Sequence, residues 1–135
     1  MSTATARYAG QLRTDATHVA SGTTIHTDAP VDNHGRGEAF SPTDLVSAAL
    51  GSCMMTIMGI VAERQGLDLR GVTWSVTKHM AAEPRRIAEI ELAFRMPASL
   101  SDKERSTLEN AARTCPVALS LNPEIRQSVQ FSYEG

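Results

Sequence analysis

The run LVSAALGSCMMTIMGIVA, residues 45–62, contains eighteen consecutive residues without a formal charge. A helix of this length is close to the minimum that spans a membrane. Three hydroxyl residues and two glycines interrupt the run, however, and charged residues stand at both of its ends. We therefore expect a central helix that is buried on all sides within the protein, and we favour it over a membrane span.

Capping signals mark both ends of this helix. Ser41 can serve as the N-cap, Pro42 as the first helical residue, and Asp44 as the acidic residue that returns a hydrogen bond to the cap. Gly66 is a natural stop at the other end. The expected helix, residues 42 to about 65, is roughly 36 Å long at 1.5 Å per residue and is therefore as long as a small domain is wide.

Small residues reduce the bulk of this helix. They either allow a second helix or a second chain to approach closely, or only relieve crowding in the core, and the sequence leaves both interpretations open. These residues are Ala48, Ala49, Gly51, Ser52 and Gly59.

Two short strands are expected before the helix. Residues 7–12 and 23–27 have strand-like patterns and are joined through a polar turn, so a hairpin is the simplest arrangement. Residues 28–40, DAPVDNHGRGEAF, are rich in turn-forming residues. They predict a loop that could border a functional site.

The second half of the chain predicts two antiparallel strands, a helix and a closing strand. Apolar and polar residues alternate over 72–77 and 88–96, with a turn around Glu83-Pro84 between them. A capping box at Ser101 begins a helix that ends near Thr114. Pro116 then starts a short helical turn, and residues 125–133 form the last strand. The order is typical of an α+β fold.

Length and charge limit the classes of function. A chain of 135 residues fits one domain, which we expect to span 1–135. With 13 basic and 15 acidic residues and no basic cluster, the sequence indicates no nucleic-acid partner and no anionic membrane partner. The N-terminus has no pattern of a secretory signal, so we expect a cytoplasmic protein.

The two cysteines, Cys53 and Cys115, indicate neither a zinc site nor a secreted disulfide scaffold. Cys115 lies at a helix start, where a thiolate is favoured. Cys53 lies in the middle of the long helix, so a lower pKa would require a basic residue from elsewhere in the fold. From these positions alone, two inert buried cysteines and a redox pair both remain open.

The histidines and methionines of the sequence give only weak indications of a functional site. His18, His26, His34 and His79 have no spacing that builds a metal site, so we predict no metal and no cofactor. Methionines surround Cys53, at positions 54, 55 and 58. They either fill the core or form a pliable apolar pocket beside the sulfur.

Two distant motifs together resemble a known family. The stretch FSPTDLVSAALGSC, residues 40–53, is followed 62 residues after its cysteine by Cys115-Pro-Val. This combination resembles the OsmC/Ohr family of thiol-dependent hydroperoxide reductases, in a less-characterised branch. The resemblance implies an OsmC-like α+β fold in which long central helices are wrapped by antiparallel β-sheets. It also implies an intertwined homodimer whose active sites lie at the subunit interface.

The resemblance further implies roles for the site residues. Cys53 would attack an organic hydroperoxide, and Cys115 would resolve the resulting sulfenic acid as a disulfide, which an external dithiol then reduces. The substrate chain would lie on apolar residues, for which we name Met54, Met58 and Phe40.

In the family, an arginine stabilises the thiolate and a glutamate holds the arginine. The position ten residues before Cys53 is Thr43, and the acidic residue, Asp44, comes one place later. One residue turns a helical side chain by about 100°. Asp44 therefore either caps the helix or pairs with an arginine.

The arginine is either Arg13, after the first predicted strand, or Arg36, in the loop before the helix, and we favour Arg13. Glu38 is a further acidic candidate. The alternative to a peroxidase is a non-catalytic OsmC-like dimer that binds a small hydrophobic or electrophilic molecule at the subunit interface.

Overall fold

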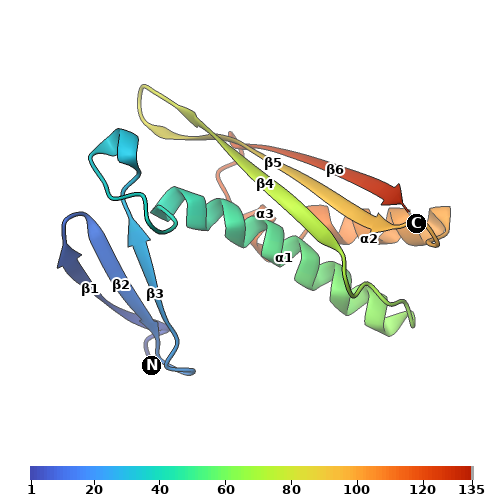
Figure 1. The fold of residues 1–135 in the computed structure, drawn as a ribbon. Helices are drawn as coiled ribbons and strands as arrows, with labels where there is room; N and C mark the ends of the chain where they lie inside the picture. Colours follow the sequence, from blue (N-terminus) through green and yellow to red (C-terminus); the bar gives the residue numbers. More distant parts are fainter. Residues whose placement is uncertain (135) are drawn as a thin grey trace. The chain divides into compact units, whose positions relative to one another are not determined.

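The computed structural model describes residues 1–134, which contain two three-stranded sheets, one long helix and shorter helices (Figure 1). The chain divides into two compact units. The N-terminal unit is Met1–Val46, and the C-terminal unit comprises the residues from Ser47 onward.

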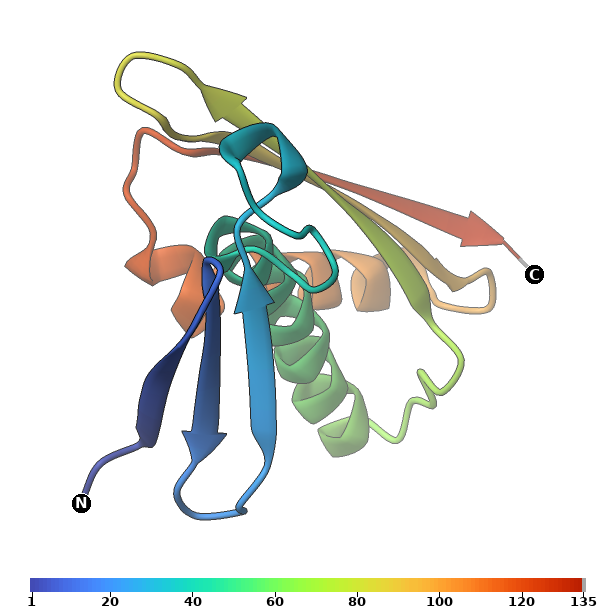
Figure 2. The same cartoon turned by 60° about the vertical axis from the view of Figure 1, so that its left-hand side comes forward.

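The N-terminal unit is built on a sheet with the order β1-β2-β3. Its strands are β1 (Ala4–Gly10), β2 (Arg13–His18) and β3 (Thr24–Asp28), and both pairings are antiparallel. Figure 2 shows the three strands side by side. A 3₁₀ turn, η1 (Val31–Asn33), lies in the loop that follows β3.

The strand β2 corrects the prediction of a two-stranded hairpin. The turn between β1 and β2 is tight, with positive φ angles of 55° at Gln11 and 62° at Leu12. Such turns ordinarily contain asparagine or glycine, and neither of these two residues belongs to that set. The backbone N–H of Leu12 donates a hydrogen bond to the Tyr8 hydroxyl at 3.2 Å. Because the turn lacks its usual residues, the sequence pattern hides it.

The long helix α1 (Pro42–Arg64) has the predicted extent. Its first turn contains the expected capping box. The backbone N–H of Asp44 donates to Ser41 Oγ at 3.1 Å, and the Ser41 N–H donates to Asp44 Oδ2 at 3.0 Å. These two bonds satisfy donors that a helix start would otherwise leave unpaired.

The second sheet has the order β4-β5-β6. Strand β4 (Thr73–Ala81) is antiparallel to β5 (Arg86–Pro97), as predicted, whereas β6 (Arg126–Glu134) is parallel to β5. The helices α2 (Asp102–Arg113) and α3 (Pro116–Ser120) connect β5 to β6. A crossover of this length permits parallel pairing. The α+β prediction is therefore confirmed, with one mixed sheet in place of an entirely antiparallel one.

The core of the C-terminal unit lies between α1, α2 and the inner face of this sheet. Figures 1 and 2 show both helices on the same side of the sheet. The residues Leu50, Met54 and Met58, spaced four apart on α1, are fully buried. They belong to one cluster with buried side chains of β5 and α2, namely Ile90, Leu92, Phe94, Met96 and Leu108.

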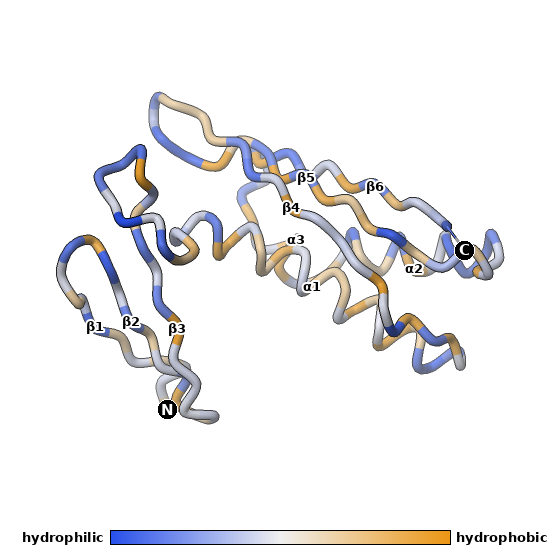
Figure 3. Tube along the Cα trace, in the orientation of Figure 1, coloured by the Kyte–Doolittle hydropathy of each residue, from blue (hydrophilic) through white to orange (hydrophobic). Residues whose placement is uncertain are grey.

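The opposite face of α1 corrects the expectation of a helix buried on all sides. Only 33% of its most apolar 18-residue window is buried, and Ile60 is 40% exposed. By length and composition α1 could cross a membrane, a test that the core helices of soluble proteins also pass. Figure 3 shows hydrophobic residues along most of the helix. Within a single chain, α1 therefore buries one face and leaves apolar surface on the other.

Gly51 brings α1 close to the second sheet. A Cβ atom at this position would lie 2.6 Å from Trp74 Nε1 and 3.1 Å from Leu92 Cδ2. The Trp74 ring is itself stacked on Phe94, with ring centroids 5.7 Å apart. A side chain larger than glycine at position 51 would therefore require the Trp74 ring or the helix to shift.

We expect Gly51→Ala to destabilise the protein by about 1–2 kcal/mol. Overpacking costs about 1–3 kcal/mol and outweighs the helix propensity gained by removing a mid-helix glycine. Urea unfolding of wild type and variant measures the difference. The same substitution should cost less in a Trp74→Phe background, because the smaller ring lacks the indole nitrogen that the methyl group meets. A Gly51→Ala variant as stable as wild type would contradict this packing.

Candidate functional site

The two cysteines lie next to each other in the C-terminal unit, and both are free thiols. Cys53 is on α1 at the border of its buried face and is half-buried, whereas Cys115 is completely buried. Cys115 is the N-cap of α3. The two thiols are neighbours, because Cys53 is among the groups that raise the pKa of Cys115. The structure therefore joins two cysteines that are 62 positions apart in the sequence.

Burial raises the pKa of Cys115, and so opposes the effect that its place at a helix start has in favour of a thiolate. The helix start does act on the sulfur, since the Ala118 N–H donates to Cys115 Sγ at 3.5 Å and opposes the rise. Burial is the larger influence, and the interaction with Cys53 raises the pKa of Cys115 further. Burial therefore makes the Cys115 thiolate less favourable than that of an exposed cysteine.

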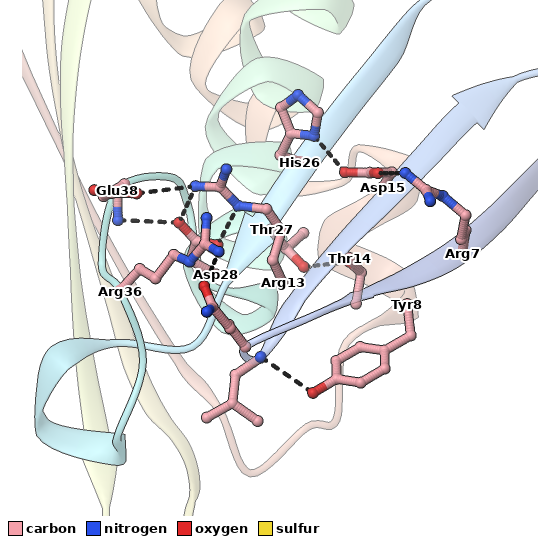
Figure 4. A network of polar contacts seen from close by, with 12 residues as sticks. Arg7, Tyr8, Arg13, Thr14, Asp15, His26, Thr27, Asp28, Arg36 and Glu38 are labelled. Carbon is pink, nitrogen blue, oxygen red and sulfur yellow. Dashed lines mark hydrogen bonds and ion pairs between the residues drawn. The ribbon is translucent and has the colours of Figure 1, made fainter.

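The N-terminal unit contains an arginine held by two carboxylates (Figure 4). Arg13 Nε donates to Asp28 Oδ1 at 2.7 Å, and a second guanidinium nitrogen donates to Asp28 Oδ2 at 2.8 Å. Glu38 Oε1 accepts a longer bond of 3.3 Å from the same group. This two-pronged pairing fixes the plane of the guanidinium, which a single contact would not do.

Asp28 was not identified from the sequence. Its side chain is fully buried at the end of β3, and it also accepts a hydrogen bond from the Glu38 backbone N–H at 3.1 Å. The hydrogen bonds from Arg13 hold the pKa of Asp28 below its usual value, and Asp28 in turn raises the pKa of Arg13. Arg13 and Asp28 are paired across β2 and β3, and this pairing depends on a strand register that the spacing along the chain does not show.

The other predicted candidates for the arginine and its acid have different local contacts. Arg36 donates a hydrogen bond to the side chain of Gln11 and acts on Asp28 only through its charge. Asp44 accepts the capping bond from Ser41 described above. Arg13 thus contacts two carboxylates, and Asp44 makes the capping bonds that were one of its two predicted options.

Two of the predicted substrate contacts belong to the core. Met54 and Met58 are both 0% exposed and pack on the face of α1 that covers the sheet. Their complete burial corrects the prediction that they form the bed for a substrate chain. Phe40, in the N-terminal unit, is 55% exposed and is free to contact a ligand.

One further group among residues 1–134 has the composition of a metal site. His79, Glu89 and Glu91 lie on the outer face of the second sheet, and their ligand atoms are all within 4.8 Å of one another. This face is opposite to the core that contains Cys115, so the group is separate from the thiol pair.

Comparisons with known proteins agree on the fold. The family model described as OsmC-like protein matches residues 35–130. A crystal structure from Psychrobacter arcticus 273-4, named after an osmotic stress and detoxification response, is 50% identical over 98% of this chain and 96% of that one, with a TM-score of 0.95. None of the curated proteins matches the sequence.

More distant structures share the fold alone. An organic hydroperoxide resistance protein OsmC from Legionella pneumophila is 19% identical over 98% of both chains, with a TM-score of 0.71. An organic hydroperoxide resistance protein from Elizabethkingia anophelis is 16% identical over 99% of this chain and 98% of that chain, with a TM-score of 0.76.

The lowered pKa of Asp28 predicts how acid affects stability. A carboxyl whose pKa is lower in the folded chain stabilises the fold above its unfolded pKa of about 3.9, and this contribution is lost as the pH falls through the folded value. We expect the Tm of Asp28→Asn to fall less steeply than that of wild type below about pH 4. The variant should still lose some stability at low pH, because the pKa values of Asp15 and Asp68 are also lowered.

Thermal unfolding followed by circular dichroism between about pH 2 and 7 checks this expectation. The variant should also have the lower Tm at neutral pH, where it lacks the ionised partner of Arg13. If the Tm of the two proteins fell in parallel as the pH is lowered, the Arg13–Asp28 pair would contribute nothing to the loss of stability in acid.

Proposed function

This chain belongs to the OsmC family, and we propose that it is a thiol-dependent peroxidase that reduces organic hydroperoxides. The observation that carries the proposal is the asymmetry of its two adjacent thiols. Cys53 is half-buried, whereas its neighbour Cys115 is fully buried. A peroxide would therefore meet Cys53 first, and the second thiol is already in place to react with the product.

The first step oxidises Cys53. Its thiolate attacks one oxygen of the hydroperoxide, the O–O bond breaks, and the sulfur becomes a sulfenic acid. The other oxygen leaves as an alkoxide, which takes up a proton and departs as the alcohol. The sulfur loses two electrons, and the peroxide gains them.

The second step forms a disulfide within the chain. The Cys115 sulfur attacks the sulfenic sulfur of Cys53, and the hydroxyl leaves as water with the proton of Cys115. An external dithiol then attacks the disulfide by thiol exchange, which regenerates both cysteines and converts the reductant to its own disulfide. No metal or cofactor takes part in this cycle.

Arg13 is proposed to stabilise the negative charge that Cys53 needs for attack. A positive group near a cysteine favours the thiolate. Asp28 and Glu38 support this role because they hold the guanidinium in one orientation. In this proposal Asp28 takes the place of the glutamate that the OsmC/Ohr resemblance implies, while Asp44 begins α1.

The substrate is proposed to have an apolar body. Ile57 lies one turn after Cys53, and like Cys53 it is half-buried at the border of the fully buried row of α1. With the exposed ring of Phe40, it would contact an alkyl or aryl chain while the peroxide group reaches Cys53. Such contacts favour organic hydroperoxides over hydrogen peroxide, since burial of apolar surface contributes about 25 cal/mol per Å².

A homodimer is proposed as the working form of this single OsmC-like domain. The face of α1 that one chain leaves uncovered includes Val46, 38% exposed, and Ile60, 40% exposed. Uncovered apolar surface on a long helix is typical of an interface. A second copy of the chain would bury this face. We place the dimer in the cytoplasm, where free cysteines remain reduced.

Peroxide consumption with a dithiol reductant tests the proposed cycle. With cumene hydroperoxide and dithiothreitol, wild type should turn over, Cys53→Ser should be inactive, and Cys115→Ser should consume about one equivalent and then slow, because its sulfenic acid has no internal partner. If Cys53→Ser consumes peroxide as fast as wild type, the proposal is wrong. Tight binding of an apolar ligand without any turnover would support the non-catalytic alternative.

The same assay isolates the role of Arg13. Arg13→Ala should lower the rate of Cys53 oxidation, whereas Arg7→Ala should leave it unchanged. The control is well matched, because Arg7 pairs with Asp15 within the same sheet at 2.8 Å. Equal losses in both variants would show that the effect arises from the sheet rather than from the Arg13 guanidinium.

The proposed dimer predicts that a charge placed on its interface halves the molar mass measured in solution. Ile60→Glu places a charge on the uncovered face of α1 and should convert the protein to monomers, as measured by size-exclusion chromatography with light scattering. Val31→Glu, a matched change at a position 74% exposed in η1, should leave the dimer intact. A wild-type protein that is monomeric at high concentration would contradict the dimer.

A further inference from the structure

We propose that His79, Glu89 and Glu91 form a binding site for a divalent transition-metal ion, with zinc as the representative ion. The site lies on the outer face of the second sheet. The imidazole nitrogen and the carboxylate oxygens of these residues all lie within 4.8 Å of one another. This assignment is independent of the proposed peroxidase, which uses none of these three residues.

The register of β4 and β5 creates the group. His79 is paired directly with Glu89, and Glu91 lies two residues further along β5, on the same face of the sheet. The register shifts beside the pair, because Met80 is opposite Ile87 and Ala88 has no partner. An irregularity of this kind reorients side chains locally, and it lies directly next to the proposed ligands.

Existing hydrogen bonds hold the donors near one another. His79 Nε2 lies 2.8 Å from Glu91 Oε1, and Ser128 Oγ on β6 donates to Glu89 Oε2 at 2.5 Å. The imidazole and Glu91 are in direct contact, so a metal ion can replace the shared proton between them. Ser128 then remains as the outer partner that orients the carboxylate of Glu89.

The surface beside these ligands is hollowed. A hollow of about 330 Å³ is lined by Glu89 and Glu91 of β5, together with residues of β4 and β6 that have hydroxyl or amide side chains. Its polar side chains include Ser75, Thr77, Ser128 and Gln130. A metal held by three protein ligands keeps a position for water, and this hollow provides the space and the hydrogen-bond partners for it.

The mixture of donors selects the class of ion. Calcium and magnesium prefer sites made of oxygen alone, whereas an imidazole nitrogen favours zinc and its transition-metal neighbours. Ligand atoms around a tetrahedral zinc ion lie about 3.4 Å apart, given bond lengths of about 2.1 Å. The side chains of His79 and Glu91 are 46% and 51% exposed. They can therefore rotate to bring the ligand atoms from within 4.8 Å of one another to the spacing that zinc requires, while the backbone of the strands stays in place.

The test must separate this site from the cysteines, because thiolates also bind zinc. We therefore use a full-length Cys53→Ser/Cys115→Ser background and titrate it with zinc chloride by calorimetry. The expected result is one equivalent of zinc. The affinity should fall at least about tenfold in His79→Ala and in Glu89→Gln/Glu91→Gln. Glu124→Gln, a change of an exposed carboxylate before β6, should bind zinc as the background does.

Circular dichroism of each variant confirms that these surface changes leave the fold intact. A proton NMR spectrum should show the His79 imidazole signals moving on addition of zinc. The proposal is overturned if the background shows no saturable binding up to about 1 mM zinc, a limit that corresponds to about −4 kcal/mol. It is also overturned if both ligand variants bind zinc as tightly as the background. Neither result would bear on peroxide turnover by the cysteines.

Discussion

The close approach of α1 to the second sheet at Gly51 determines where the reactive groups lie. A glycine at this position lets the helix rest against Trp74, and the row of Leu50, Met54 and Met58 then fills the space over β5. Cys53 precedes Met54 by one residue, a rotation of about 100°, so it lies at the border of the buried face. A helix held further from the sheet would not bring Cys53 to the same place beside the buried Cys115.

The two thiols acquire different properties from the same packing. The start of α3 offers Cys115 a backbone N–H, which alone would favour its thiolate, but complete burial outweighs this and raises its pKa. A buried, protonated thiol is protected from direct oxidation and is available only to a group already beside it. Cys53 is that neighbour, and in the proposed cycle the division between attack and resolution would follow from burial rather than from the helix start.

Local signals predicted most of the elements, and contacts set by tertiary structure escaped prediction. The capping residues Ser41 and Ser101 and the alternation in β4 and β5 are encoded within a few positions, so those elements were identified correctly. The strand β2 was missed because its turn at Gln11 and Leu12 lacks turn-forming residues. The partners Arg13–Asp28 and His79–Glu89 depend on strand register, which no spacing along the chain reveals.

The central claim is that Cys53 and Cys115 act as one dithiol, and the mass of the intact protein tests it most directly. Reduced protein is treated with one equivalent of cumene hydroperoxide and then with an alkylating reagent under denaturing conditions. The predicted result is a chain that has lost two hydrogen atoms, carries a Cys53–Cys115 disulfide and takes up no alkyl group. A chain in which both thiols are still fully alkylated after that treatment would contradict the account.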